Sequence, residues 1–187
     1  MVTEIRVYFE GDKTLRSGFA ALLAEIRGRA RNQQVRFELI ACGATPVQDF
    51  LIALKKHQQA WNILLKDSEG PAADNLQAPQ GTDPNSVFWM VQLMEAWFLA
   101  DPDALKHYYG QRFKTSALQK NPRVEEIPKA DVLTCLKEAT KDTQKGSYHK
   151  TKHAPLILER ISPERVKQAA PNCRRMFSAV LAKLDEG

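Results

Sequence analysis

Strand-like and helix-like segments alternate through the first 70 residues, and this order restricts the possible folds most strongly. Apolar residues dominate or alternate in residues 4–10, 35–41 and 61–65, as they do in buried strands. Between these segments, apolar residues recur at helical spacing over residues 13–29 and again after Pro46. A β-α-β-α-β order with short connections predicts parallel strands joined by crossover helices.

The middle of the chain allows two interpretations. Residues 70–85 are rich in Pro, Gly, Asp and Asn, which predicts a mobile surface loop. Residues 87–91 then predict a fourth strand, followed by a helix over residues 93–99; a single helix over residues 86–100 is the alternative. The expected fold class is an α/β Rossmannoid with about four mainly parallel strands flanked by helices.

The second half of the chain is predicted to be helical. Short helices are expected over residues 103–109, 129–139, 153–161, 163–169 and 172–184. We therefore expect an α/β core over residues 1–105 and a helical basic extension over residues 106–187, packed on the core as one structural unit.

Charge is distributed unevenly between these two parts. Residues 1–105 contain 10 Lys and Arg against 13 Asp and Glu, whereas residues 106–187 contain 17 against 9. A basic region beside an acidic site suits a polyanionic ligand, such as nucleic acid, held near a bound cation. The alternative is an ordinary solvated surface that is rich in lysine.

Other features exclude several classes of protein. No apolar stretch approaches the roughly 18 residues of a membrane span, and the first residues form a strand pattern with no signal peptide. Cys42, Cys135 and Cys173 are widely spaced, which excludes a paired-cysteine zinc site and indicates buried thiols in a reducing compartment. The expected location is the cytoplasm, without membrane attachment.

Three carboxylates follow two of the predicted strands. Glu10 ends the first strand, and Asp67 and Glu69 follow the third. If the strand order begins 2-1-3, these side chains meet at the carboxyl edge of the sheet, where α/β proteins bind ligands. Clustered carboxylates repel one another unless a cation is present, and oxygen ligands favour Mg²⁺ or Mn²⁺. The alternative is a set of solvated loop acids.

Two further acids flank the apolar segment 96–100. Glu95 is a candidate fourth metal ligand that reaches the acidic edge from the end of the fourth strand. Asp101 precedes Pro102, and its simpler interpretation is the end of a helix.

Several basic or hydroxyl-bearing side chains are candidate phosphate contacts. Lysine presents a compact charge suited to phosphate, and a tyrosine hydroxyl can donate a hydrogen bond. The candidates are Arg16, Lys145, Tyr148, Lys150 and Lys152. His149 and His153 have the spacing of a helical zinc pair, but the sequence offers no third ligand nearby.

Several longer motifs resemble a bacterial family. They occupy residues 9–11, 67–69, 94–101, 127–132 and 145–150. Together they are similar, over nearly the whole chain, to the RloG-like family (domain of unknown function 4276). That family resembles the Toprim fold of topoisomerases, primases and OLD-type nucleases.

The resemblance implies roles for the three carboxylates. In the Toprim pattern, a Glu after the first strand acts as general acid or base, and an Asp-x-Asp after the third strand holds Mg²⁺. Glu10 matches the first position, and Asp67 with Glu69 occupies the second, with Glu69 in place of the usual Asp.

Two functions are consistent with these features. The first is a Mg²⁺-dependent phosphoryl-transfer enzyme of nuclease type that acts on nucleic acid or another phosphate ester. The second is a non-catalytic module that binds nucleic acid, a nucleotide or a partner protein; family resemblance implies a role beside an ATPase in bacterial defence.

Overall fold

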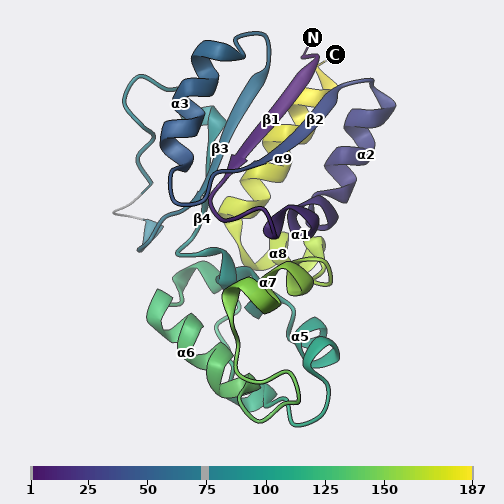
Figure 1. The fold of residues 1–187 in the computed structure, drawn as a ribbon, viewed down its shortest axis with the longest axis vertical. Helices are drawn as coiled ribbons and strands as arrows, with labels where there is room; N and C mark the ends of the chain where they lie inside the picture. The colour runs from purple at the N-terminus through teal and green to yellow at the C-terminus, as the bar shows by residue number, and fades with distance from the viewer. Residues whose placement is uncertain (1, 73–75, 187) are drawn as a thin grey trace.

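Four parallel strands form the centre of the computed structural model, which describes residues 2–72 and 76–186. The strands are β1 (Glu4–Phe9), β2 (Arg36–Ala41), β3 (Trp61–Asp67) and β4 (Val87–Met90). Their order in the sheet is β2-β1-β3-β4 (Figure 1). The predicted α/β class is confirmed, and β1 and β3 are neighbours as expected.

Helices surround the sheet and continue beyond one end of it. The α-helices are α1 (Leu15–Leu22), α2 (Ala24–Asn32), α3 (Pro46–Lys56), α5 (Pro102–Tyr109), α6 (Lys129–Thr140), α7 (Lys150–Leu158), α8 (Pro163–Ala169) and α9 (Pro171–Asp185). The 3₁₀ helices are η1 (Pro84–Ser86), η2 (Met94–Ala100), η3 (Thr115–Ala117) and η4 (Val124–Glu126).

Alternating side chains of the strands supply two apolar cores. In β1, Val7 and Phe9 point into the larger core with α1, α2 and α9, whereas Tyr8 points into the smaller core with Phe50 of α3. This alternation is the two-residue period of a strand, and both faces are covered, as parallel sheets require. The result is three layers, with α3 on one face and α1, α2 and α9 on the other (Figure 1).

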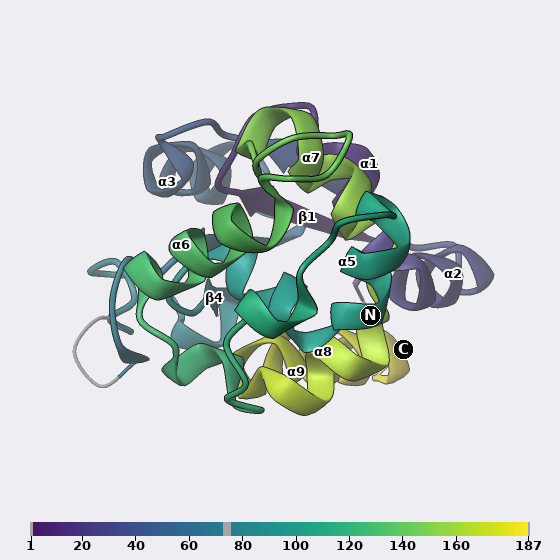
Figure 2. The same cartoon turned by 90° about the horizontal axis from the view of Figure 1, so that it is seen from below.

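The second half of the chain occupies two places. Helices α5, α6 and α7 lie past the carboxyl ends of the strands, at the lower end of the molecule in Figure 1 and toward the viewer in Figure 2. The chain then returns to the sheet, because α9 packs on α2 and β4. Arg175 of α9 donates to the Val87 carbonyl (2.5 Å) and lies over the Phe88 ring.

The structure corrects three details of the sequence prediction. Residues 13–29 form α1 and α2 rather than one helix, and the break at Leu23 lets the adjacent Leu22 and Leu23 both face the core. Residues 86–100 are strand followed by 3₁₀ helix, so the single-helix alternative is wrong. Helix α7 begins at Lys150 and ends at Leu158, three residues before the predicted bounds.

Two expectations have a more limited outcome. The predicted mobile loop over residues 70–85 includes residues 73–75, which lie outside the described residues. Within the part of the chain that the structure describes, each helix falls short of the length and apolar character that a membrane crossing needs.

Candidate functional site

Glu10 is placed by the abrupt end of β1. Its backbone N–H donates to the Leu65 carbonyl of β3 (2.9 Å). Gly11 follows with φ of +121°, and a Cβ there would lie 2.4 Å from Leu15 Cδ1. Gly11 and Gly43 exchange backbone hydrogen bonds of 3.0 and 2.8 Å. Glycine is therefore required after Glu10, where the chain leaves the sheet for α1.

Asp67 and Glu69 are placed by the end of β3. Asp67 is its last residue, and its Oδ1 accepts from the Met94 N–H (2.8 Å) at the start of η2. Two residues on, the Glu69 N–H donates to the Gln92 carbonyl (2.9 Å). Glu69 has φ of +64°, an uncommon value for a residue with a Cβ.

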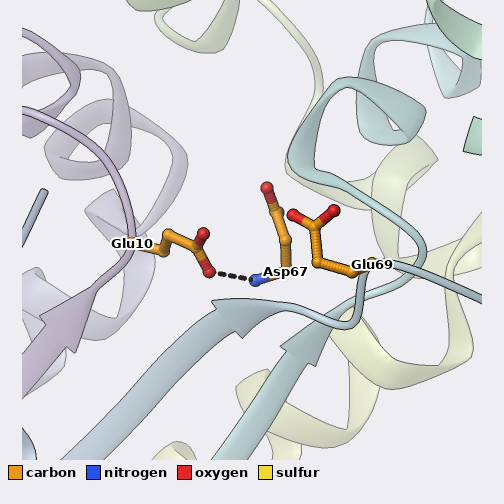
Figure 3. A group of neighbouring side chains, drawn as sticks. All are labelled: Glu10, Asp67 and Glu69. Carbon is orange, nitrogen blue, oxygen red and sulfur yellow. Dashed lines mark hydrogen bonds between the residues drawn. The ribbon is translucent and has the colours of Figure 1, made fainter. Parts of the chain in front are cut away.

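The three predicted carboxylates meet at the carboxyl edge of the sheet. One oxygen from each of Glu10, Asp67 and Glu69 lies within 4.8 Å of the others, and Figure 3 shows the side chains gathered there. A Glu10 oxygen also accepts from the Asp67 N–H (3.0 Å), drawn as the dashed line in Figure 3. The three residues offer only oxygen donors, which suit Mg²⁺ or Mn²⁺. The residues present therefore fit such a cation.

The electrostatics of this carboxylate group are unfavourable for Asp67 as an anion. Only 4% of Asp67 is exposed. Burial raises the pKa of Asp67 to about 7, and the charges of Glu10 and Glu95 act in the same direction. Lys150 and the Met94 N–H partly oppose this rise in pKa. Neighbouring carboxylates that raise one another's pKa are a feature of sites that bind a cation.

Glu95 lies beside this group rather than in it. It is 1% exposed, and its Oε1 accepts from the Tyr148 hydroxyl (3.0 Å). The Lys150 ammonium lies 3.5 Å from Glu95 Oε1 and 3.8 Å from Asp67 Oδ2. Among the described residues, Glu95 Oε2 has no hydrogen-bond partner although it is buried. Lys150 thus connects Glu95 to Asp67.

Tyr148 and Lys150 have partners that sequence reasoning did not anticipate. Tyr148 is 5% exposed, so its hydroxyl serves the buried Glu95 rather than a ligand at the surface. Burial and the Glu95 charge raise the pKa of this hydroxyl. Burial of the Lys150 stem opposes its charge, yet Glu95 and Asp67 raise the pKa of the ammonium overall.

Lys129 and Gln92 complete the surroundings, and sequence reasoning missed both. The Lys129 ammonium pairs with Glu69, and its backbone N–H donates to Gln92 Oε1 (3.0 Å). Gln92 therefore joins Glu69 and Lys129 through its carbonyl and its side chain. Lys129 lies in one of the motifs that carry the family resemblance, and this was the available signal.

Three other predicted phosphate contacts lie away from the carboxylates or carry no described contact to them. Arg16 lines a cavity of about 800 Å³ between α1 and β2, with Lys13 and Arg27. Lys145 lines another cavity, of about 550 Å³, beside Tyr108 and Arg160. The carboxylates of the site line neither cavity. Lys152 is exposed on α7.

The histidine pair does not form a metal site with a third ligand in the described residues. His153 is buried, and its Nδ1 accepts from the His149 N–H (3.0 Å) and lies 3.0 Å from the Tyr109 hydroxyl. The one group of three or more suitable side chains found in residues 2–72 and 76–186 is Glu10, Asp67 and Glu69.

Comparisons with known proteins give a family but no activity. The model of a family described as Domain of unknown function (DUF4276) matches residues 13–181. No curated protein and no solved structure matches the chain. Since the match covers most of the 187 residues, including two of the three clustered carboxylates, the chain belongs to this family of unknown function.

Proposed function

We propose that this protein is a Mg²⁺- or Mn²⁺-dependent phosphoryl-transfer enzyme of nuclease type, acting on nucleic acid or another phosphate ester. One observation carries the proposal: oxygens of Glu10, Asp67 and Glu69 lie within 4.8 Å of one another at the carboxyl edge of a parallel sheet. That edge is the general ligand-binding position of open α/β sheets.

The three carboxylates divide the work. Asp67 and Glu69 hold the cation, since they leave neighbouring positions of one chain segment and point to a common centre. When bound, a divalent cation supplies charge stabilisation at the oxygens of a transferring phosphoryl group. Glu10 keeps one oxygen free of its bond to the Asp67 N–H, and that oxygen serves as a further ligand or accepts a proton.

The finer family assignment belongs to the same proposal. We propose that the chain is an RloG-like protein related to Toprim domains. The β2-β1-β3-β4 order supports this relationship, as do the positions of Glu10 after β1 and of Asp67 and Glu69 after β3. Glu69 departs from the usual Asp, but its carboxylate still reaches the group from a left-handed backbone position.

The test is hydrolysis of a phosphodiester by the purified chain. Wild type is expected to cleave single-stranded DNA, RNA or a chromogenic phosphodiester with Mn²⁺ and to lose this activity in EDTA. Glu10→Gln and Asp67→Asn should each reduce the rate by at least about a hundredfold, the usual contribution of an acid, base or metal ligand.

The matched control removes a carboxylate elsewhere. Glu138→Gln changes an exposed acid on α6 that pairs with Lys141 and should leave the rate unchanged. Absence of cleavage on all three substrates, or equal activity in Glu10→Gln, would count against the enzyme proposal.

A second function is favoured by the lysines beside the site. Lys129 and Lys150 already neutralise part of the carboxylate charge. This suits a non-catalytic module that binds a nucleic acid, nucleotide or partner protein, and it leaves open a role beside an ATPase. Such a module would bind its ligand equally well as wild type and as Glu10→Gln, with no turnover.

A further inference from the structure

Two lysines from the basic half of the chain reach the carboxylates of the site. Lys129 is the first residue of α6, and its ammonium pairs with Glu69. Lys150 is the first residue of α7, and its ammonium lies between Asp67 and Glu95. Ion pairs across 60 and 83 positions of sequence do not arise from local helix geometry, so tertiary packing places both ammonium groups here.

The charges of this assembly leave room for one divalent cation. Glu10, Asp67, Glu69 and Glu95 contribute four negative charges when ionised, and Lys129 and Lys150 contribute two positive charges. The remaining charge of −2 is the charge that Mg²⁺ or Mn²⁺ neutralises. The buried Glu95 Oε2, which lacks a hydrogen-bond partner among the described residues, is a second sign that the carboxylates are not fully compensated.

The two lysines are anchored by their backbones while their ammonium groups stay accessible. The Lys129 N–H is bonded to Gln92. Helix α7 packs closely on α1, where a Cβ at Gly18 would lie 2.6 Å from Leu158 Cβ. The side chains of Lys129 and Lys150 are 40% and 51% exposed. A flexible four-carbon stem lets each ammonium change partners without movement of its helix.

We propose that Lys129 and Lys150 are internal counter-ions of the carboxylates, which a divalent cation displaces, and that the displaced ammonium groups then bind a phosphate of the substrate. This inference rests on the proposed function. Its consequence is that cation and phosphate bind cooperatively, because each removes a cost that the other would meet.

The first experiment measures Mn²⁺ binding by calorimetry to the metal-free full chain, at about pH 8.5 so that protons compete little for the carboxylates. Lys129→Gln and Lys150→Gln should each tighten Mn²⁺ binding about tenfold, because each removes a like charge a few ångström from the ion. Lys129→Arg and Lys150→Arg keep the charge and should bind Mn²⁺ as wild type does.

A charge-matched control separates the local effect from net charge. Lys106→Gln on α5 and Lys137→Gln on α6 each remove an exposed lysine that is outside the site, and should leave Mn²⁺ affinity unchanged. Equal affinity in wild type and both site variants, with binding still abolished by Asp67→Asn, would overturn the inference and leave the proposed function intact. No Mn²⁺ binding by any of these proteins would overturn both.

The second experiment measures the phosphate side of the inference. A fluorescent thymidine oligonucleotide is titrated with and without saturating Ca²⁺, which replaces Mn²⁺ so that cleavage stays slow. Wild type should bind the oligonucleotide more tightly with Ca²⁺, and the Lys129→Gln/Lys150→Gln variant should lose that gain. A gain that persists in this variant would overturn the assignment of the two lysines to phosphate.

Discussion

Asp67 is held by three separate segments of the chain. The start of η2 donates to one of its oxygens, Lys150 of α7 lies beside the other, and its backbone N–H donates to Glu10. These contacts fix the carboxylate in a buried position among other acids. Its geometry is therefore determined before any ligand arrives, at an electrostatic cost to the folded protein.

Asp67→Asn should stabilise the metal-free protein in a pH-dependent manner. The folded-state pKa of Asp67, about 7, is above its ordinary value of 3.8, so stability is complete below about pH 4 and falls as the pH rises through 7. The loss at about pH 8 is on the order of 3 kcal/mol. In EDTA, Asn at this position should raise Tm by several degrees at about pH 8 and by little at about pH 4. The same Tm difference at both pH values would show that the carboxylate charge is not its cause.

Tyr148→Phe should destabilise the protein without creating a cavity. The change deletes the hydroxyl that donates to the buried Glu95, and the loss of a hydrogen bond to a charged group costs about 2 kcal/mol. Urea denaturation measures the free energy of unfolding. Tyr108→Phe is the control, since Tyr108 is partly exposed beside Lys145 and Arg160. Equal losses in the two variants would exclude a specific role for the Glu95 hydrogen bond.

At the level of elements, the contact between α1 and α7 sets the position of Lys150. Gly18 of α1 faces Leu158 and the Pro155 carbonyl of α7, and an added Cβ would lie 2.6 and 2.8 Å from them. The absence of a side chain lets the two helices approach closely. The first turn of α7, with Lys150, is thereby brought to the carboxyl edge of the sheet.

Gly18→Ala should therefore weaken the protein, although alanine favours a helix. Overpacking of a close contact costs about 1–3 kcal/mol, against a gain in helix propensity of about 1 kcal/mol. Gly28→Ala on α2 is the matched control, because nothing lies within 4 Å of the position that a Cβ would take there, and it should stabilise the protein slightly. Thermal melts of both variants measure the difference. A Gly18→Ala protein as stable as Gly28→Ala would mean that α7 can move away freely.

The elements differ in how far the sequence determines them. The three first strands and α3 were predictable because the apolar period, Gly11 and Pro46 mark them locally. The same periodicity placed Glu10, Asp67 and Glu69 together, since parallel strands end at one edge. The break at Leu23 was not predictable, because neither glycine nor proline marks it. Lys129 was missed because its pairing with Glu69 depends on how α6 packs beyond the sheet.

At the level of the whole molecule, the basic half of the chain surrounds the acidic edge of the sheet. Helices α5, α6 and α7 lie past the carboxyl ends of the strands, and α9 returns to the sheet beside β4 (Figures 1 and 2). Residues 106–187 contain 17 Lys and Arg against 9 Asp and Glu. A polyanion that approaches this end of the molecule meets lysines before it meets carboxylates.

Binding of an oligonucleotide should therefore weaken steeply with salt. Removal of Lys145, Lys150 and Lys152 together by substitution with Gln should lower affinity and reduce the slope of log affinity against log salt by up to about three phosphate contacts. The charge-matched control is Lys55→Gln/Lys56→Gln/Lys183→Gln, at the ends of α3 and α9. Anisotropy titrations at several salt concentrations measure both slopes. Equal slopes in the two triple variants would assign the binding to net charge alone.

The long separations between the contacting residues of the site also affect how the chain folds. Glu10 and Asp67 are 57 positions apart, Met94 and Asp67 are 27 apart, and Lys129 and Glu69 are 60 apart. Contacts of such high sequence separation form slowly, because the chain must close large loops before they stabilise it. The carboxylates are thus brought together late, after α6 and α7 have docked, and an incompletely folded chain lacks a cation site. Metal affinity is in this sense a measure of native assembly, available during refolding as a signal that only the finished topology produces.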